Sequence, residues 1–128
     1  MVLDPPAGLR GKRLDAVLKI ADKLLIPLQP SLFDIQATHA FLTELREFPR
    51  SHRIRLGLVG MRVKDHTISQ ERLQEYAATL KAPMVATLRD TQNYVHLAAH
   101  GLTLWDIAPS RVERDLAQWE TLLAWVNG

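Results

Sequence analysis

The sequence predicts an α/β fold in which helices flank a mainly parallel sheet, and three observations support this prediction. Strand-like and helix-like patterns alternate along the chain and are joined by only a few residues. The strand-like segments are short, nearly continuous apolar runs, as in strands that are buried on both faces. Apolar residues make up 47% of the sequence and charged residues 23%, which is the balance of a packed globular domain. Alternation of this kind produces right-handed strand–helix–strand units.

Four segments are predicted to be strands: residues 1–4, 23–28, 54–60 and 83–88. Four short strands are few for a parallel sheet, and the first of them begins at Met1. A strand in that position of a parallel sheet is usually central and needs a neighbour on each side. We therefore expect open sheet edges and a chain that associates with itself through its N-terminal strand.

The segments between the strands carry apolar residues at helical spacing. A first helix is expected over residues 12–21. A second is expected to begin after Ser31, with Asp34 in its first turn, and to run to about Phe48. A third helix, which includes Leu73, Tyr76, Ala77 and Leu80, is expected to have Ser69 as its N-cap.

Two further helices are predicted towards the C-terminus. Residues 91–100 form one of them, which Gly101 would end in the left-handed conformation. The last has the clearest start, because Ser110 and Glu113 have the spacing of a capping box. Its apolar stripe contains Val112, Leu116, Trp119, Leu122, Leu123 and Val126.

Length and composition limit what the protein can be. The 128 residues fit a single domain, 1–128. The sequence has no cysteine, which excludes disulfides, thiolate metal sites and a cysteine nucleophile. Its longest apolar run, residues 24–28, is too short to span a membrane, and no basic segment with an apolar core opens the chain. We therefore expect a cytoplasmic protein with no membrane partner.

Basic residues are clustered, although the net charge is only +2. One group lies near the start of the chain, and a larger one runs from Arg46 to Lys64. Such clusters are either solvated side chains on loops and helix ends or a patch for a polyanion, such as a nucleotide or DNA. The sequence alone leaves both interpretations open.

The first residues carry the most specific chemical signal. A short apolar run ends in Asp4, and Pro5-Pro6 forms a stiff turn before Ala7-Gly8. Many α/β nucleotide hydrolases place a magnesium-directed carboxylate in this way, with a flexible glycine beside the terminal phosphate. The alternative is an aspartate that caps an ordinary rigid turn. No G-x-x-x-x-G-K-[ST] phosphate loop occurs in the sequence.

Three segments, in this order, resemble the C-terminal half of the ParA/MinD-type partition ATPases, the deviant P-loop group. Residues 2–9, V-L-D-P-P-A-G-L, are similar to the magnesium motif of that family. Residues 21–30, A-D-K-L-L-I-P-L-Q-P, are similar to a family strand that reads A-D-apolar-P-apolar-x-P. The third segment comprises residues 58–67, 88–90 and 98–101, which correspond to regions that frame the adenine pocket in the family.

The resemblance implies a P-loop NTPase-like, Rossmann-like half domain that lacks the phosphate-binding loop. It implies ATP and Mg²⁺ as the cofactors of the family, and we expect the chain alone to bind neither. By this resemblance Asp4 would hold the metal ion. The cofactor-binding positions would be Asp4, Pro5, Gly8, Met61, Arg62, Arg89 and Asp90. Candidate contacts to DNA would be Arg53, Arg55, Arg62 and Arg89.

The sequence departs from the family pattern in two respects. The phosphate loop with its lysines, and the switch carboxylate, both precede the magnesium motif in the family and do not occur here. Where the family has N-R-x-D, this chain has Met61-Arg62-Val63-Lys64, so the asparagine that reads adenine and the aspartate are both replaced. We therefore expect no catalytic residue in this chain.

Two functions are expected from the resemblance. The first is that of a ParA-like ATPase for plasmid or chromosome partition or for cargo positioning, of which this chain is a truncated and inactive part. In the family such an ATPase dimerises with ATP, binds DNA without sequence preference and is stimulated by a partition partner protein. The alternative is a non-catalytic ParA-like remnant that acts as an oligomerisation or protein-binding module. Both imply a homo-oligomer.

Overall fold

The computed structural model describes residues 1–64 and 67–128, and in these residues it contains one open sheet of three strands. The strands are β1 (Lys23–Leu28), β2 (Arg55–Val63) and β3 (Met84–Arg89), in the spatial order β1-β2-β3. Both neighbouring pairs run parallel. The predicted parallel α/β fold is therefore confirmed, and three of the four predicted strands form close to their expected positions.

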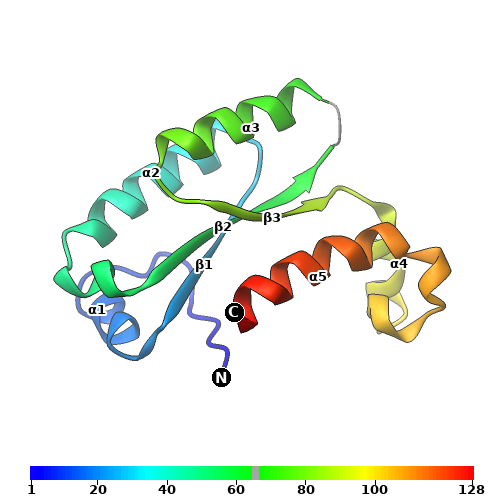
Figure 1. Cartoon of the computed structure of the whole chain (residues 1–128), viewed down its shortest axis with the longest axis horizontal. Helices are drawn as coiled ribbons and strands as arrows, with labels where there is room; N and C mark the ends of the chain where they lie inside the picture. Colours follow the sequence, from blue (N-terminus) through cyan, green and yellow to red (C-terminus); the bar gives the residue numbers. More distant parts are fainter. Residues whose placement is uncertain (65–66) are drawn as a thin grey trace.

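Helices cover the sheet on both faces (Figure 1). On one face lie α2 (Leu32–Arg46) and α3 (Ile68–Thr79), and on the opposite face lies α5 (Glu113–Asn127). The short helix α1 (Gly11–Ile20) precedes β1, and α4 (Gln92–Ala99) follows β3. Single 3₁₀ turns occupy Pro49–Arg53, Leu104–Asp106 and Pro109–Arg111. None of the described helices is long and apolar enough to cross a membrane.

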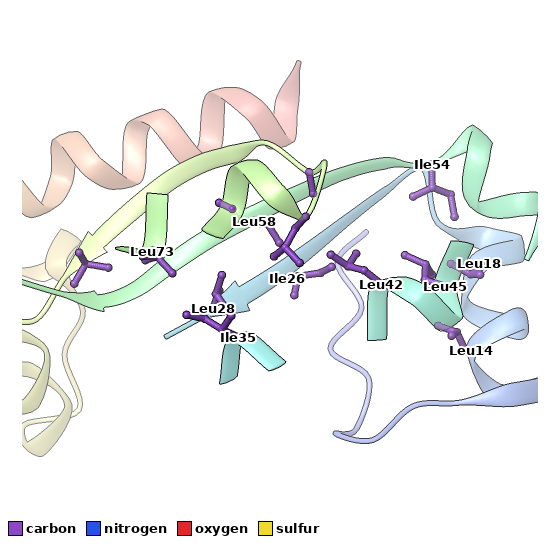
Figure 2. Packing of buried hydrophobic residues seen from close by; sticks show 14 residues of the cluster. Leu14, Leu18, Ile26, Leu28, Ile35, Leu42, Leu45, Ile54, Leu58 and Leu73 are labelled. Carbon is purple, nitrogen blue, oxygen red and sulfur yellow. The ribbon is translucent and has the colours of Figure 1, made fainter. Parts of the chain in front are cut away.

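The larger buried cluster fills the space between the sheet and the layer of α1, α2 and α3 (Figure 2). Leu58 lies at its centre on β2 and is fully buried. Leucine and isoleucine side chains of β1 and of the helices α1, α2 and α3 belong to the same cluster. The cluster includes Leu14, Leu18, Ile26, Leu28, Ile35, Leu42, Leu45 and Leu73.

A smaller cluster joins α5 to the opposite face of the sheet, where Val59, Ala86, Leu88 and Leu122 are buried together. Close approach at the end of α5 requires a glycine on β2. A Cβ atom on Gly57 would lie 2.9 Å from the ring of Trp125. Because α5 packs mainly on β3, it leaves the same face of β1 uncovered, and Leu25 is 37% exposed there.

The predicted strand over residues 1–4 is wrong. These residues have no regular secondary structure and are exposed, and the chain makes a turn at residues 7–8, where Gly8 has a φ of 74°. A strand is stable only when a neighbour pairs with its backbone groups, and none of the described strands pairs with this segment. The glycine turn was predicted, whereas the strand before it does not form.

Two predicted helix starts also differ from the structure. Thr67, not Ser69, caps α3, because its hydroxyl accepts a hydrogen bond from the Gln70 backbone N–H. Ser110 does not cap α5: it belongs to a 3₁₀ turn, and the helix starts at Glu113 without a side-chain cap. The Ser31 cap of α2 is confirmed, and Gly101 follows α4 with a φ of 68°, as predicted. Residues 65–66, part of the segment 58–67 that resembles the adenine-pocket region of the family, lie outside the described residues.

Candidate functional site

The carboxyl ends of β2 and β3 bring four of the predicted site residues to one edge of the sheet. Met61 and Arg62 lie near the end of β2, Arg89 ends β3, and Asp90 follows it. The Asp90 backbone N–H donates to the Val63 carbonyl at 3.0 Å, which holds the two strand ends together. In open parallel sheets, ligands bind outside the carboxyl ends of the strands. This edge is therefore the candidate functional site.

Arg62 has an unusual backbone conformation. Its φ is 53°, in the left-handed region that non-glycine residues rarely occupy, and the register between β2 and β3 shifts at this point. The resulting irregularity places the Arg62 Nε 3.8 Å from the Asp90 Oδ1. The Arg62 side chain is 69% exposed, so this ion pair adds little to stability. Both charged groups remain accessible to a ligand at the edge.

Arg89 is engaged differently, in a network around a buried carboxylate. Its Nε donates to the Asp115 Oδ1 at 2.5 Å and its Nη2 to the Oδ2 at 3.0 Å. The Asn93 side-chain amide donates to the same Oδ2 at 3.0 Å. Asp115 is completely buried, and the hydrogen bonds from Arg89 lower the pKa of its carboxyl group. The same hydrogen bonds raise the pKa of Arg89, so both groups are charged at neutral pH.

The network ties both C-terminal helices to the end of β3. Asn93 comes from α4 and Asp115 from α5, while the Gln118 side chain accepts a hydrogen bond from the Arg89 backbone N–H at 2.9 Å. Close by, the Trp119 indole N–H donates to the Tyr94 hydroxyl at 3.2 Å. Arg89 is therefore primarily an anchor of the fold beneath the candidate site, and it can act on a ligand only through its remaining 27% exposed surface.

The N-terminal candidates stand apart from this edge. Asp4, Pro5 and Gly8 are exposed, and no described contact joins them to Arg62 or Asp90. Among the described residues, no group of three or more histidines or carboxylates is placed to hold a metal ion. The described residues thus do not form a complete site for Mg²⁺ or for a triphosphate, and the metal role of Asp4 stays a prediction.

The four predicted DNA contacts are divided between opposite ends of the sheet. Arg62 and Arg89 lie at the carboxyl edge, and each has an acidic partner. Arg53 and Arg55 lie at the amino edge, where η1 (Pro49–Arg53) leads into β2. The four arginines therefore cannot form one continuous patch.

Solved structures resemble this chain in fold. The MinD cell division protein of Aquifex aeolicus superimposes with a TM-score of 0.61 at 20% sequence identity, over 77% of this chain. This chain thus shares the P-loop NTPase-like fold of MinD. The match covers 42% of the MinD chain, so the present sequence corresponds to less than half of that protein. No family model and no curated protein matches the sequence.

The buried carboxylate of Asp115 was not predicted from the sequence. One signal could have revealed it: Asp115 lies three residues after Val112 and four before Trp119, both members of the apolar stripe of the last helix. That spacing puts Asp115 on the buried face of α5. A carboxylate on a buried face needs a cationic partner, which in the structure is Arg89 at the end of β3.

Proposed function

We propose that this chain is part of a ParA/MinD-type positioning or partition ATPase. The observation that carries the proposal is the MinD-like fold combined with three sequence segments that follow the family order. In this proposal the carboxyl edge with Met61, Arg62 and Asp90 faces the base of a bound nucleotide, and Asp4 serves its magnesium ion. The phosphate loop would have to come from a segment outside the present sequence.

The genomic reading frame tests this proposal directly. An in-frame K-G-G-x-G-K-[ST] motif upstream of the codon for Met1 supports it, and the longer product should then hydrolyse ATP. A stop codon immediately upstream contradicts the ATPase proposal and favours the second function considered below.

The chain as given should not hydrolyse ATP at a useful rate. Catalysis of phosphoryl transfer consists almost entirely of positioning and charge neutralisation, and the sequence lacks the phosphate loop and its lysine. Phosphate release by the purified chain should therefore equal the buffer blank, both for the wild type and for Asp4→Ala. Turnover that disappears in Asp4→Ala would contradict this prediction and reveal a phosphate site within these residues.

A second function, as an oligomerisation module, is favoured by the open edge of β1. The Asp22 carbonyl accepts a hydrogen bond from the Arg55 N–H at 3.1 Å, so alternate residues from Asp22 onwards direct their backbone groups towards β2. The backbone groups of Lys23, Leu25 and Pro27 consequently face outward, where no described strand pairs with them. Pro27 lacks an N–H, as is common on edge strands. The remaining groups can pair with another strand.

The chain should therefore self-associate through β1, rather than through residues 1–4 as the sequence suggested. Light scattering at about 100 μM, where even weak association is populated, should report a dimer or a larger species. Leu25→Lys should shift the distribution towards monomer, because a charge on an edge strand opposes pairing. Val95→Lys, at a position on α4 that is 60% exposed and belongs to no strand, is the control and should leave the distribution unchanged. A clean monomer for the wild type would contradict the module.

A further inference from the structure

A basic pocket of about 440 Å³ lies at the amino edge of the sheet, at the opposite end from the candidate nucleotide site. It forms where α1 ends and where β1 and β2 begin, and η1 supplies one wall. Cavities of this size take small organic ligands. The cationic residues that line it are Lys19, Lys23, Arg50, Arg53 and Arg55.

The helix type of η1 brings two of these cations together. A 3₁₀ helix has three residues per turn, so side chains three positions apart lie above one another. Arg50 and Arg53 have this spacing, and both line the pocket. Arg55 joins the same cavity from the start of β2. Three guanidinium groups therefore line one small volume, where their charges repel one another unless an anion lies between them.

The acidic groups nearby do not balance this charge. Asp15 lies 3.6 Å from the Arg50 Nε and also pairs with Lys19 at 3.8 Å, while Asp22 belongs to the lining. A terminal carboxylate on Gly128 would raise the number of anions to three, against five cations. The pocket thus keeps an excess of positive charge.

Lys23 and Arg55 differ in what they have left to offer a ligand. The Lys23 ammonium uses all three donors to fix the end of α5. Its acceptors are the carbonyl oxygens of Trp125, Val126 and Gly128, at 2.9, 2.7 and 2.9 Å. Arg55 donates from one terminal nitrogen to the Gly128 oxygen at 3.3 Å and lies over the Trp125 ring. Lys23 is therefore structural, whereas Arg55 retains donors.

The two arginines of η1 also retain donors. Arg50 reaches Asp15 through its Nε and is 52% exposed. The Arg53 side chain is exposed, and no hydrogen bond or ion pair joins it to another residue among those that the structure describes. Each guanidinium carries five N–H groups in a planar fork that matches carboxylate and phosphate oxygens.

The carboxyl end of β3 shows how few arginines a carboxylate needs in this fold. One guanidinium, that of Arg89, donates to both oxygens of Asp115, and one amide N–H of Asn93 completes the set. A phosphate group has three acceptor oxygens and close to two negative charges at neutral pH. It can therefore engage several forks at once, so three arginines around one cavity match a phosphate better than a carboxylate.

We propose that the amino-edge pocket binds the phosphate group of a small phosphorylated molecule through Arg50 and Arg53, with Arg55 as the third contact. A lone phosphate ion would fill only part of the 440 Å³. The remaining space has apolar walls that suit a carbon skeleton, formed by Leu18, Ala21 and Ile54. This site is separate from the candidate nucleotide site, and the inference does not rest on the proposed function.

A heteronuclear NMR titration of the full nitrogen-labelled chain with ribose 5-phosphate tests the proposal. The ionic strength is held at about 0.1 M, where charges more than about 10 Å apart are largely screened. The amide signals of residues 50–55 should shift and saturate at millimolar ligand, whereas those of Arg62 and Asp90 should not move. Ribose, which lacks the phosphate, should cause no shift. Succinate, with its two charges on separate carboxylates, should bind more weakly.

A pair of double variants locates the contact. Arg50→Gln/Arg53→Gln should weaken binding about tenfold or more, because it removes two charge-assisted contacts. Lys64→Gln/Arg111→Gln removes the same charge from exposed positions after β2 and before α5, and is the matched control. Lys64 is about 30 Å from Arg55 along β2, so the control should change the affinity by less than about twofold. Circular dichroism should show that both variants are folded.

A single substitution should strengthen binding, which a general loss of structure cannot do. Asp15→Asn frees Arg50 from its acidic partner and should tighten binding about two- to fivefold, the effect of one exposed ion pair. Glu113→Gln makes the same change of charge at the start of α5, about 20 Å from the end of that helix. This control should leave the affinity unchanged.

Five results would overturn the proposal. These are no saturable shift at residues 50–55 with ribose 5-phosphate, equal weakening in the two double variants, no gain in Asp15→Asn, binding of succinate as tight as that of the ester, and tighter binding of inorganic phosphate than of the ester. The last would indicate a site for the free ion. The assay contains no nucleotide and no metal ion, so its failure leaves the ATPase proposal untouched. A stop codon upstream of Met1 would likewise leave the pocket untouched.

Discussion

Asp115→Ala should destabilise the protein by about 3 kcal/mol, since breaking a buried ion pair from one side leaves its partner uncompensated. The Asp115 carboxylate is fully buried, and it accepts hydrogen bonds from Arg89 and Asn93. Without it, the Arg89 guanidinium would lose both of its side-chain acceptors. The expected cost is at the lower end of the range for buried pairs, because Arg89 is 27% exposed and keeps some contact with water. Urea unfolding monitored by tryptophan fluorescence measures it.

Matched variants separate the ion pair from a general effect on α5. Glu113→Ala lies in the first turn of the same helix but is exposed, and it should cost less than about 1 kcal/mol. Arg89→Met/Asp115→Leu removes both charges and should be more stable than Asp115→Ala alone. If Asp115→Ala stays within about 1 kcal/mol of the wild type, the network does not anchor the helices.

The same pair predicts the sign of the pH dependence. The folded-state pKa of Asp115 lies below its unfolded value, chiefly because of the hydrogen bonds from Arg89. Its contribution to stability is therefore fully present above the unfolded pKa of about 3.9 and is lost as the pH falls through the folded-state pKa. The wild type should lose more stability than Asp115→Asn on acidification below about pH 4.

The fold was predictable from the sequence wherever the pattern was local. The strand over residues 23–28 formed at those residues, because an apolar run before Pro30 leaves few alternatives. The cap at Ser31 was equally local, since a serine hydroxyl and the backbone N–H of Asp34 are enough to start a helix. The strand over residues 1–4 failed because a strand depends on a partner that its own sequence cannot specify.

The candidate site was predictable only in part, for the same reason. Arg62, Arg89 and Asp90 meet because neighbouring parallel strands end at one edge, and alternation of strands and helices predicts that arrangement. The left-handed conformation of Arg62 and the pairing of Arg89 with Asp115, 26 residues later, depend on tertiary packing. Arg53 and Arg55 lie apart from Arg62 because β2 separates them. The sequence pattern predicts the length of such a strand only to within a few residues.

Leu58→Ala should cost about 2–5 kcal/mol, with the largest effect expected among single truncations of the core. Leu58 has no exposed surface, lies on the central strand and packs in the cluster that α1, α2 and α3 share with the sheet (Figure 2). The backbone of β2 at Leu58 is held in place by the strands on both sides. The surroundings therefore cannot collapse easily into the cavity that the substitution leaves. Leu32→Ala, at a position 66% exposed on α2, is the control and should change stability by less than about 1 kcal/mol.

The combination of Leu58→Ala with Asp115→Ala then tests how the two faces of the sheet are coupled. Leu58 packs towards α2 and α3, whereas Asp115 anchors α5 on the opposite face, and the two share no described contact. If the chain unfolds as one unit, each variant lowers the same single transition, and their costs add to within about 0.5 kcal/mol. We expect that result, because β2 contributes buried residues to both faces. Two separate transitions in Asp115→Ala would show instead that α4 and α5 can detach while the sheet and the other helices stay folded.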